Sequence, residues 1–408
     1  MNQKLFSRAM TEINDKYYEE AARYPCRHKK ALRMNWGAAA AGFCLMVLGT
    51  VALLNHNMPD PPIEENKFAD SSDATGVPVQ KQPETELPML TVRDGENDPV
   101  GGGFEGYWAY NISELVNANP WNESMELSTL PVYKNPVTYD EQYHASGVDF
   151  DKMREFILET AARFGFDTDT LTIEDTYNFP TSCLIIEADG LKIEVDQTMM
   201  AEISFDPAVP LPAEYNFTFY APYEDVAAAA EYLKAKYKNI IGMDNPQVNI
   251  HGGDYTYSAQ QCYDISYFDA VGSDTEQIIN YNFNKVFFYC DGEGKLFLAR
   301  IFQPDLSGKI GDYPIISPEE AGTLLSNGYY ITSVPYEMPG SEYVRKVELI
   351  YRTGEFEEYY MPYYRFYVEL SEEEIPHDLK TYGAYYVPAV SGEYIANMPT
   401  GDDRFHYY

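Results

Sequence analysis

Met361-Pro-Tyr-Tyr-Arg-Phe-Tyr-Val-Glu-Leu370 is the stretch of this chain that decides the fold. Successive side chains of a β-strand point to opposite faces of the sheet. One face would hold Tyr364, Phe366, Val368 and Leu370, and the other would hold Tyr363, Arg365, Tyr367 and Glu369. This alternation predicts a half-buried strand that is covered on one side.

The residues around this strand predict a unit, 306–408, in which one helix lies on an antiparallel sheet. Ser317 is an N-cap, Pro318 is the first helical residue, and Glu320 completes a capping box. Gly328 follows the helix and ends it. Two more strands are expected beside Met361–Leu370: Tyr343–Thr353 and Tyr382–Val390.

Two similar units, 106–215 and 216–305, precede it. In the first, Asp149 or Asp151 caps a helix whose buried face holds Met153, Phe156, Ile157, Thr160 and Phe164. Its expected strands are Cys183–Ala188 and Leu191–Val195, joined at the turn Asp189-Gly190, and then Met199–Phe205. In the second, Pro222 opens a helix, and the expected strands are Gln261–Phe268, Ile279–Phe283, Lys285–Cys290 and Lys295–Phe302. The predicted fold class is therefore α+β, with repeated units of one helix packed on an antiparallel sheet.

A helix across a curved antiparallel sheet resembles PepSY-like and cystatin-like modules. It also resembles the exterior domains of proteins that restrain cell-wall histidine kinases. The capped helix at Ser317 and the strand Tyr363-Tyr-Arg-Phe-Tyr367 carry this resemblance, which is one of architecture. It implies a regulatory domain, although a shared fold does not by itself give a function.

Residues 56–105 predict a disordered linker, rich in proline and acidic side chains. Seven prolines fall here: Pro59, Pro61, Pro62, Pro78, Pro83, Pro88 and Pro99. Such a composition buries little apolar surface. Leu87–Val92 is apolar enough to dock back on the domain as a strand. Gly101, Gly103 and Gly106 match GxGxxG, but no strand precedes them and no helix follows, so no phosphate site is expected.

The segment Trp36–Leu54, within residues 35–55, contains nineteen residues without one charge. As a helix it rises roughly 28 Å, about the thickness of the hydrocarbon core of a bilayer. The preceding tail has a net charge of +4 within a chain of −35, which places the tail in the cytoplasm. A cleaved signal peptide is the alternative, but no small-residue cleavage site follows the apolar run. Residues expected at the membrane interface are Trp36, Lys29, Lys30 and Arg33.

The cytoplasmic tail, residues 1–34, predicts an amphipathic helix. Its apolar stripe contains Phe6, Ala9, Met10, Ile13 and Tyr17. Such a stripe lies on the inner leaflet, frays, or pairs with another helix. In the last case Phe6, Met10, Ile13 and Tyr17 are the partner-binding residues.

The run Ile13-Asn-Asp-Lys-Tyr-Tyr-Glu-Glu-Ala-Ala22, followed by a basic stretch and an alanine-rich span, resembles the start of anti-sigma-factor-like membrane proteins of Gram-positive bacteria. The resemblance covers about the first 55 residues. It implies a sigma factor on the cytoplasmic side and a sensing part outside. Many such proteins hold zinc with one His and two Cys, whereas this tail has only Cys26 and His28, too few for a tetrahedral site.

The rest of the chain advertises no catalytic, cofactor or metal residues. The six histidines fall in no HExxH motif, and no GxSxG or Walker motif occurs. His251-Gly-Gly-Asp254 is interpreted as a turn with a polar tip. The pairs Asp149/Asp151 and Asp167/Asp169 are interpreted as caps and loop residues, because neither continues as a calcium loop. Of the exterior cysteines, Cys183, Cys262 and Cys290, the second and third either pair or stay free.

Tyrosine is unusually common, at 37 of 408 residues, and the part after the tail is strongly acidic. Most tyrosines are expected to fill strand faces, while exposed ones suit sugars or peptides. The acidic balance disfavours nucleic acid and anionic polymers, and it favours cationic peptides or divalent ions.

Three hypotheses follow. The first is a single-pass membrane regulator or sensor without catalytic activity, with its bulk outside the cell. It would contact the bilayer, a sigma factor or histidine kinase inside, and a protein, peptide or wall component outside. The second is an envelope-binding or scaffolding module that is merely tethered. The third is an exterior hydrolase, which requires two converging carboxylates of shifted pKa in a cleft.

Overall fold

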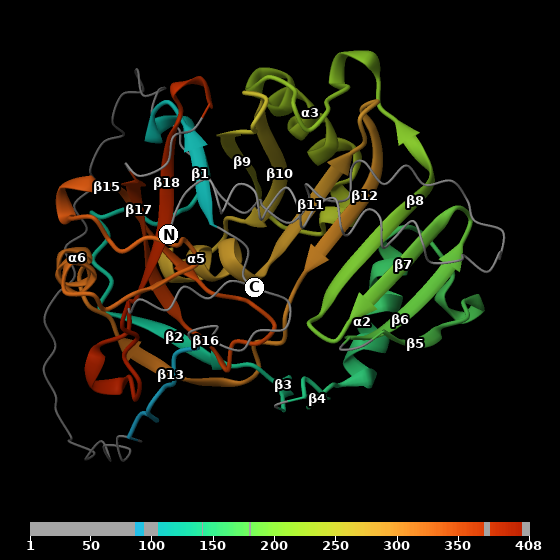
Figure 1. The fold of residues 1–408 in the computed structure, drawn as a ribbon. Coiled ribbons are helices and arrows are strands. Elements are labelled where there is room, and N and C mark those ends of the chain that lie inside the picture. The colour runs from blue at the N-terminus through green and yellow to red at the C-terminus, as the bar shows by residue number, and fades with distance from the viewer. Residues whose placement is uncertain (1–85, 94–104, 141, 179–180, 371–375, 402–408) are drawn as a thin grey trace, which may run out of the picture. The chain divides into compact units, whose positions relative to one another are not determined.

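The protein is described here from a computed structural model. It describes residues 86–93, 105–140, 142–178, 181–370 and 376–401, which all belong to one compact unit of the chain. The fold is α+β, with mostly antiparallel strands and few helices, which confirms the predicted class at that level (Figure 1). Within the described ranges, no helix is long and apolar enough to cross a membrane. The predicted tail and span lie outside those ranges.

The largest element is an eight-stranded antiparallel sheet built from two meanders (Figure 1). The first meander comprises β5 (Glu174–Asn178), β6 (Thr181–Ala188), β7 (Leu191–Asp196) and β8 (Met200–Pro210). The second comprises β9 (Pro246–Tyr255), β10 (Gln261–Asp269), β11 (Lys285–Cys290) and β12 (Lys295–Phe302). The last strands, β8 and β12, pair with each other. The strands expected for units 106–215 and 216–305 therefore share one continuous sheet.

One face of this sheet is covered by α2 (Phe150–Arg163), α3 (Tyr223–Lys236) and the short α4 (Lys238–Ile241). The Asp149 side chain caps α2 by accepting from the Lys152 N–H, as predicted. The buried positions of α2 are Met153, Phe156, Ile157, Thr160 and Ala161. Each fully buried aliphatic or aromatic side chain of this kind contributes roughly 1.5–3 kcal/mol.

The expected strand Ile279–Phe283 is wrong, because these residues belong to helix α5 (Asp274–Phe283). Ser273 caps this helix and forms a capping box with Glu276. The apolar residues alternate in a way that imitates a strand, but the box fixes the first turn as helical. Along the chain, the helix connects β10 to β11, and it contacts both strands and β15.

A second sheet has the order β1 (Gly106–Ala109), β18 (Lys380–Pro388), β17 (Pro362–Leu370), β15 (Val344–Tyr351), with β14 (Ile331–Thr332) also paired to β18. Helix α6 (Pro318–Ser326) packs on it. The predicted capping box of Ser317 and Glu320 is confirmed, and Gly328 follows the helix with φ +84°. Smaller sheets are β13 (Lys309–Pro314) with β2 (Thr129–Lys134) and β16 (Tyr359–Tyr360), and β3 (Thr138–Tyr139) with β4 (Ala145–Ser146).

Short 3-10 helices complete the fold. They are η1 (Ile112–Glu114), η2 (Thr168–Thr170), η3 (Ala213–Tyr215), η4 (Ser341–Tyr343), η5 (Pro376–Asp378) and η6 (Gly392–Tyr394). The predicted docking of Leu87–Val92 is confirmed, but through an isolated bridge between Leu90 and Ile395 and not as the expected strand. Leu90 is fully buried, and Val92 exchanges two hydrogen bonds with the Asn397 side chain, at 2.7 and 2.8 Å.

Strand β17 is buried on both faces, so the prediction of a half-buried strand is wrong. Its first face packs into a large core with α6, as expected. Its second face is also closed, since Tyr363, Arg365 and Tyr367 are 0%, 2% and 1% exposed. Tyr107 of β1 is among the residues that cover it. A charged side chain is thereby brought into the interior.

Candidate functional site

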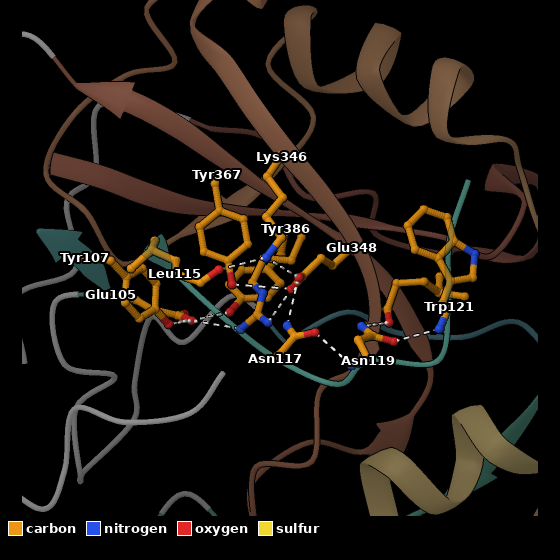
Figure 2. A network of polar contacts seen from close by, with 12 residues as sticks. Glu105, Tyr107, Leu115, Asn117, Asn119, Trp121, Lys346, Glu348, Tyr367 and Tyr386 are labelled. Carbon is orange, nitrogen blue, oxygen red and sulfur yellow. Dashed lines mark hydrogen bonds and ion pairs between the residues drawn. The ribbon is translucent and has the colours of Figure 1, made fainter. Parts of the chain in front are cut away.

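The buried Arg365 is the centre of a polar network. Its partners Glu105, Glu348 and Tyr367 are labelled in Figure 2. Its register partners are Glu348 on β15 and Tyr386 on β18, so the three residues form one row across three strands. The Arg365 Nη2 atom lies 2.8 Å from Glu348 Oε2, and Nη1 lies 3.6 Å from Glu105 Oε1. The guanidinium also lies over the Tyr367 ring, 5.1 Å from its centroid.

The remaining members of the network balance the charges (Figure 2). Lys346 Nζ lies 3.0 Å from Glu348 Oε1, which also accepts a hydrogen bond of 2.8 Å from Asn117. Glu105 Oε1 accepts from the hydroxyls of Tyr386 and Tyr107, at 2.5 and 2.8 Å. Burial opposes the charge of Arg365, but its neighbours Tyr367, Tyr386 and Glu348 outweigh burial and raise its pKa well above the usual value. Two cations and two carboxylates thus neutralise each other, with Arg365 and Glu348 buried and with Lys346 and Glu105 partly exposed.

The segment 115–121 connects this network to the eight-stranded sheet. The Val116 N–H donates to the Gly252 carbonyl, and the Ala118 N–H donates to Asn249 Oδ1, at 2.9 and 2.8 Å. In the other direction, the Asn119 side chain donates to the Leu349 carbonyl. The segment therefore lies between strands β9 and β15 and bonds to both.

The face of β9–β12 that is turned away from α2 and α3 carries further buried ionisable groups. Burial lowers the pKa of His251 to about 3, with help from Lys285 and Arg365. Burial and Arg365 lower the pKa of Lys285 to about 8. Burial raises the pKa of Asp264 to about 7, with a contribution from Asp254, and Arg300 opposes the change. Each of these groups is shifted toward its neutral form, as a low-dielectric interior requires.

The prediction that His251-Gly-Gly-Asp254 forms a turn is wrong, because these residues lie inside β9. Gly252 and Gly253 have φ of +123° and +95°, and the register with β10 shifts beside them. A Cβ on Gly253 would lie 1.9 Å from the Glu114 carbonyl oxygen. The two glycines thus form a β-bulge, and the missing side chain at Gly253 lets the backbone of η1 approach β9 closely. Alternation at Val248 and Ile250 was the available signal for the strand.

Two carboxyl groups of this interior have raised pKa values. Burial raises the pKa of Asp254 to about 6, so two carboxylates of raised pKa occupy neighbouring strands, as a hydrolase would need. Asp264, however, is only 6% exposed, which encloses it rather than presenting it to a solvent-borne substrate. Among the described residues, no group of His, Cys, Asp and Glu could hold a metal ion.

The cysteines and aspartate pairs have local roles. Cys183, Cys262 and Cys290 are unbridged, and burial raises the pKa of each thiol, which weakens them as nucleophiles. Asp149 caps α2 and Asp167 caps η2, as predicted.

Several tyrosines lie where η1, the start of α3 and the β9–β10 hairpin meet. Tyr110, Tyr223 and Tyr257 are 45%, 37% and 71% exposed. Tyr110 meets Tyr255 edge to face with centroids 5.2 Å apart, and Tyr223 meets Tyr263 in the same way at 5.6 Å. We call these five residues the tyrosine patch, in which Tyr257 lies in the turn between β9 and β10 and Tyr263 is buried, at 6% exposure. The Tyr255 hydroxyl donates to Glu114 Oε1 at 3.4 Å, which places a carboxylate at the patch.

The site residues predicted from the sequence lie outside the described ranges. They are Phe6, Met10, Ile13, Tyr17, Lys29, Lys30, Arg33 and Trp36. The network at Arg365 and the tyrosine patch were not predicted as sites. Both depend on contacts between segments far apart in the sequence.

No protein-family model matches the chain, and no curated protein matches it. Among solved structures, one match is an uncharacterised protein from Eubacterium rectale ATCC 33656. The sequence identity is 14%, and the alignment covers 65% of this chain and 85% of that chain with a TM-score of 0.32. A likeness at this level carries no argument about function.

Proposed function

We propose that the chain is a single-pass, membrane-anchored extracytoplasmic regulator or sensor without catalytic activity. One observation carries the proposal. The uncharged segment Trp36–Leu54 follows a basic tail and precedes a strongly acidic remainder. That order favours a retained span with a cytoplasmic N-terminus. Within the predicted Pro-rich linker, 56–105, residues 86–93 dock on the folded α+β part, so the stretch before them would separate that part from the span.

The folded part supports a binding role. Its strongly perturbed ionisable groups, such as Asp264 and His251, are buried between packed elements. Three of its exposed aromatic side chains, Tyr110, Tyr223 and Tyr257, belong to the tyrosine patch beside Glu114. Exposed tyrosines supply rigid contact area with a polar end, which suits recognition of a partner.

On the cytoplasmic side, the proposed partner is a sigma factor or a histidine kinase. It would bind the apolar stripe of the tail helix through Phe6, Met10, Ile13 and Tyr17. The test places a photo-crosslinking amino acid at Ile13 in the full chain in its native membrane. The matched control places it at Asp15, on the opposite side of the predicted helix.

The expected result is a crosslink from Ile13 to a sigma factor or kinase, with little from Asp15. Crosslinks to lipid alone from both positions would remove the signalling part of the proposal. The second candidate, a tethered envelope-binding module, is favoured by the patch lying wholly in the folded part. It predicts that an unrelated single-pass anchor can replace residues 1–55 without loss of function.

A further inference from the structure

We infer that the tyrosine patch binds a peptide segment bearing Lys or Arg side chains. The inference rests on the proposed binding role of the folded part and names the chemistry of the ligand. It does not depend on the cytoplasmic tail. The ligand is identified by the charge and the aromatic geometry of the patch.

The three chain segments that form the patch carry acidic side chains and no Lys or Arg. These segments are 105–118, 216–233 and 252–263. They contribute Glu114 and Glu224, in addition to the carboxylates buried below. Two lysines of neighbouring strands come close to these segments. Lys380 lies opposite Ala109, but its ammonium is paired with Glu369 at 2.9 Å. Lys346 donates to the Leu115 carbonyl at 3.2 Å, and its ammonium is paired with Glu348 at 3.0 Å. No cation of these segments therefore competes for an incoming one.

The Glu114 carboxylate is held in place before any ligand arrives. Its Oε2 atom accepts from the N–H groups of Tyr110 and Asn111, at 2.8 and 3.1 Å. Its Oε1 atom accepts from the Tyr255 hydroxyl. An ionised carboxylate accepts about four hydrogen bonds, so one position remains for a cationic donor. Because the Glu114 side chain is already ordered, binding a ligand loses less conformational entropy.

The tyrosine rings supply the second half of cation recognition. A Lys or Arg over an aromatic face is attracted by the ring, by about 0.5–1 kcal/mol at an exposed site. Tyr110 meets Tyr255 at an interplanar angle of 75° and Tyr223 meets Tyr263 at 72°, so the rings of each pair face in different directions. The three contributing segments also offer several rings in succession, which suits an extended peptide with more than one cation.

The test uses the full chain in detergent and a fluorescein-labelled peptide of alternating arginine and glycine. Fluorescence anisotropy compares it with the same peptide carrying citrulline, which keeps the shape of arginine without its charge. We expect the arginine peptide to bind at least tenfold more tightly. We also expect binding to weaken as NaCl rises from 50 to 300 mM.

Two variants locate the binding. Tyr110→Ser and Tyr257→Ser should each weaken binding about 2–5-fold. The matched control is Tyr177→Ser on β5, an exposed tyrosine beside Asp175 at the other edge of the eight-stranded sheet. This control should leave binding unchanged. Circular dichroism and thermal melting verify that each variant is folded.

Equal losses in Tyr110→Ser and Tyr177→Ser would mean general attraction to an acidic protein and would overturn the inference. Unchanged binding in both patch variants would do the same. Displacement of the labelled peptide by a neutral oligosaccharide at lower concentration than by unlabelled peptide would assign the patch to sugars instead. If the tail crosslinks fail while peptide binding holds, only the signalling proposal is lost.

Discussion

At the scale of single residues, Arg365 shows how this fold accommodates a charge that its strand pattern places inside. A buried cation costs several kcal/mol unless anions and hydrogen bonds compensate for the lost water. Glu348 and Glu105 supply the anions, at 2.8 and 3.6 Å. The Arg365 Nε atom is buried without a hydrogen-bond partner, so the compensation is incomplete. Removing one charged member of the network would therefore leave another buried charge uncompensated and destabilise the fold.

Replacing Arg365 with Met should lower the free energy of unfolding by about 3–5 kcal/mol, because it leaves Glu348 under-compensated in the interior. Adding Glu348→Gln should recover only part of the loss, since it removes the buried carboxylate charge but also takes the carboxylate partner from Lys346. Urea denaturation measures both effects. The control is Arg345→Met, whose partly exposed pair with Glu369 contributes at most about 1 kcal/mol. Similar losses in Arg365→Met and Arg345→Met would contradict the account.

Asp264 makes stability depend on pH. Its pKa is raised from 3.8 to about 7 in the folded chain by burial first and by Asp254 second. The folded chain therefore holds a proton that the unfolded chain releases, and stability is lost as the pH rises through this window. Each pH unit across it corresponds to about 1.4 kcal/mol.

We expect Asp264→Asn to be more stable than the wild type at pH 7.5 and to match it near pH 4. The measurement is the free energy of unfolding against pH, with the exposed Glu123→Gln as a control for net charge. A difference between Asp264→Asn and wild type that is the same at both pH values would show that the carboxyl group does not titrate between them.

At the scale of elements, the bulge in β9 sets how closely η1 approaches the eight-stranded sheet. Gly253→Ala should lower the free energy of unfolding by more than about 2 kcal/mol, since φ is +95° and the new Cβ meets the Glu114 carbonyl at 1.9 Å. Gly292→Ala is the control, because a Cβ there meets nothing within 4 Å. Urea denaturation followed by tryptophan fluorescence distinguishes them. Equal stabilities would mean that η1 moves aside at little cost.

The elements that could be predicted are those whose signals are local. The caps of α2 and α6, and the turn at Asp189-Gly190, depend on residues within a few positions of each other, and each is confirmed. The strand β9 was missed because its Gly-Gly pair serves a contact with η1, which lies far away in the sequence. The second buried face of β17 was missed for the same reason, since Tyr107 of β1 helps to cover it.

At the scale of the whole molecule, the abundance of tyrosine has two explanations that composition alone cannot separate. Most of the largest fully buried side chains are tyrosines: Tyr267, Tyr313, Tyr363, Tyr364, Tyr367, Tyr382 and Tyr385. These fill the cores, as the sequence led us to expect. The exposed tyrosines of the patch lie outside the strands: Tyr110 is in a bend, Tyr223 begins α3 and Tyr257 is in a turn. The buried tyrosines named above all lie in strands, so the position of each tyrosine in the fold, which composition does not give, separates the two groups.

The docking of residues 86–93 has a mechanical consequence. Tension applied from the N-terminal side would reach the described fold at Pro88, whose carbonyl accepts from the Tyr313 hydroxyl at 2.9 Å, and then at Leu90, whose backbone bonds to Tyr394 and Ala396 at 2.7 and 2.8 Å. The Val92 backbone bonds to Asn397 just beyond, and Glu105, farther along the described chain, belongs to the network of Arg365. A pulling force would thus act on the bonds of residues 88–92 before it acts on the Arg365 network. The N-terminal end of the described chain is thus attached at two successive places, residues 86–93 and the Arg365 network.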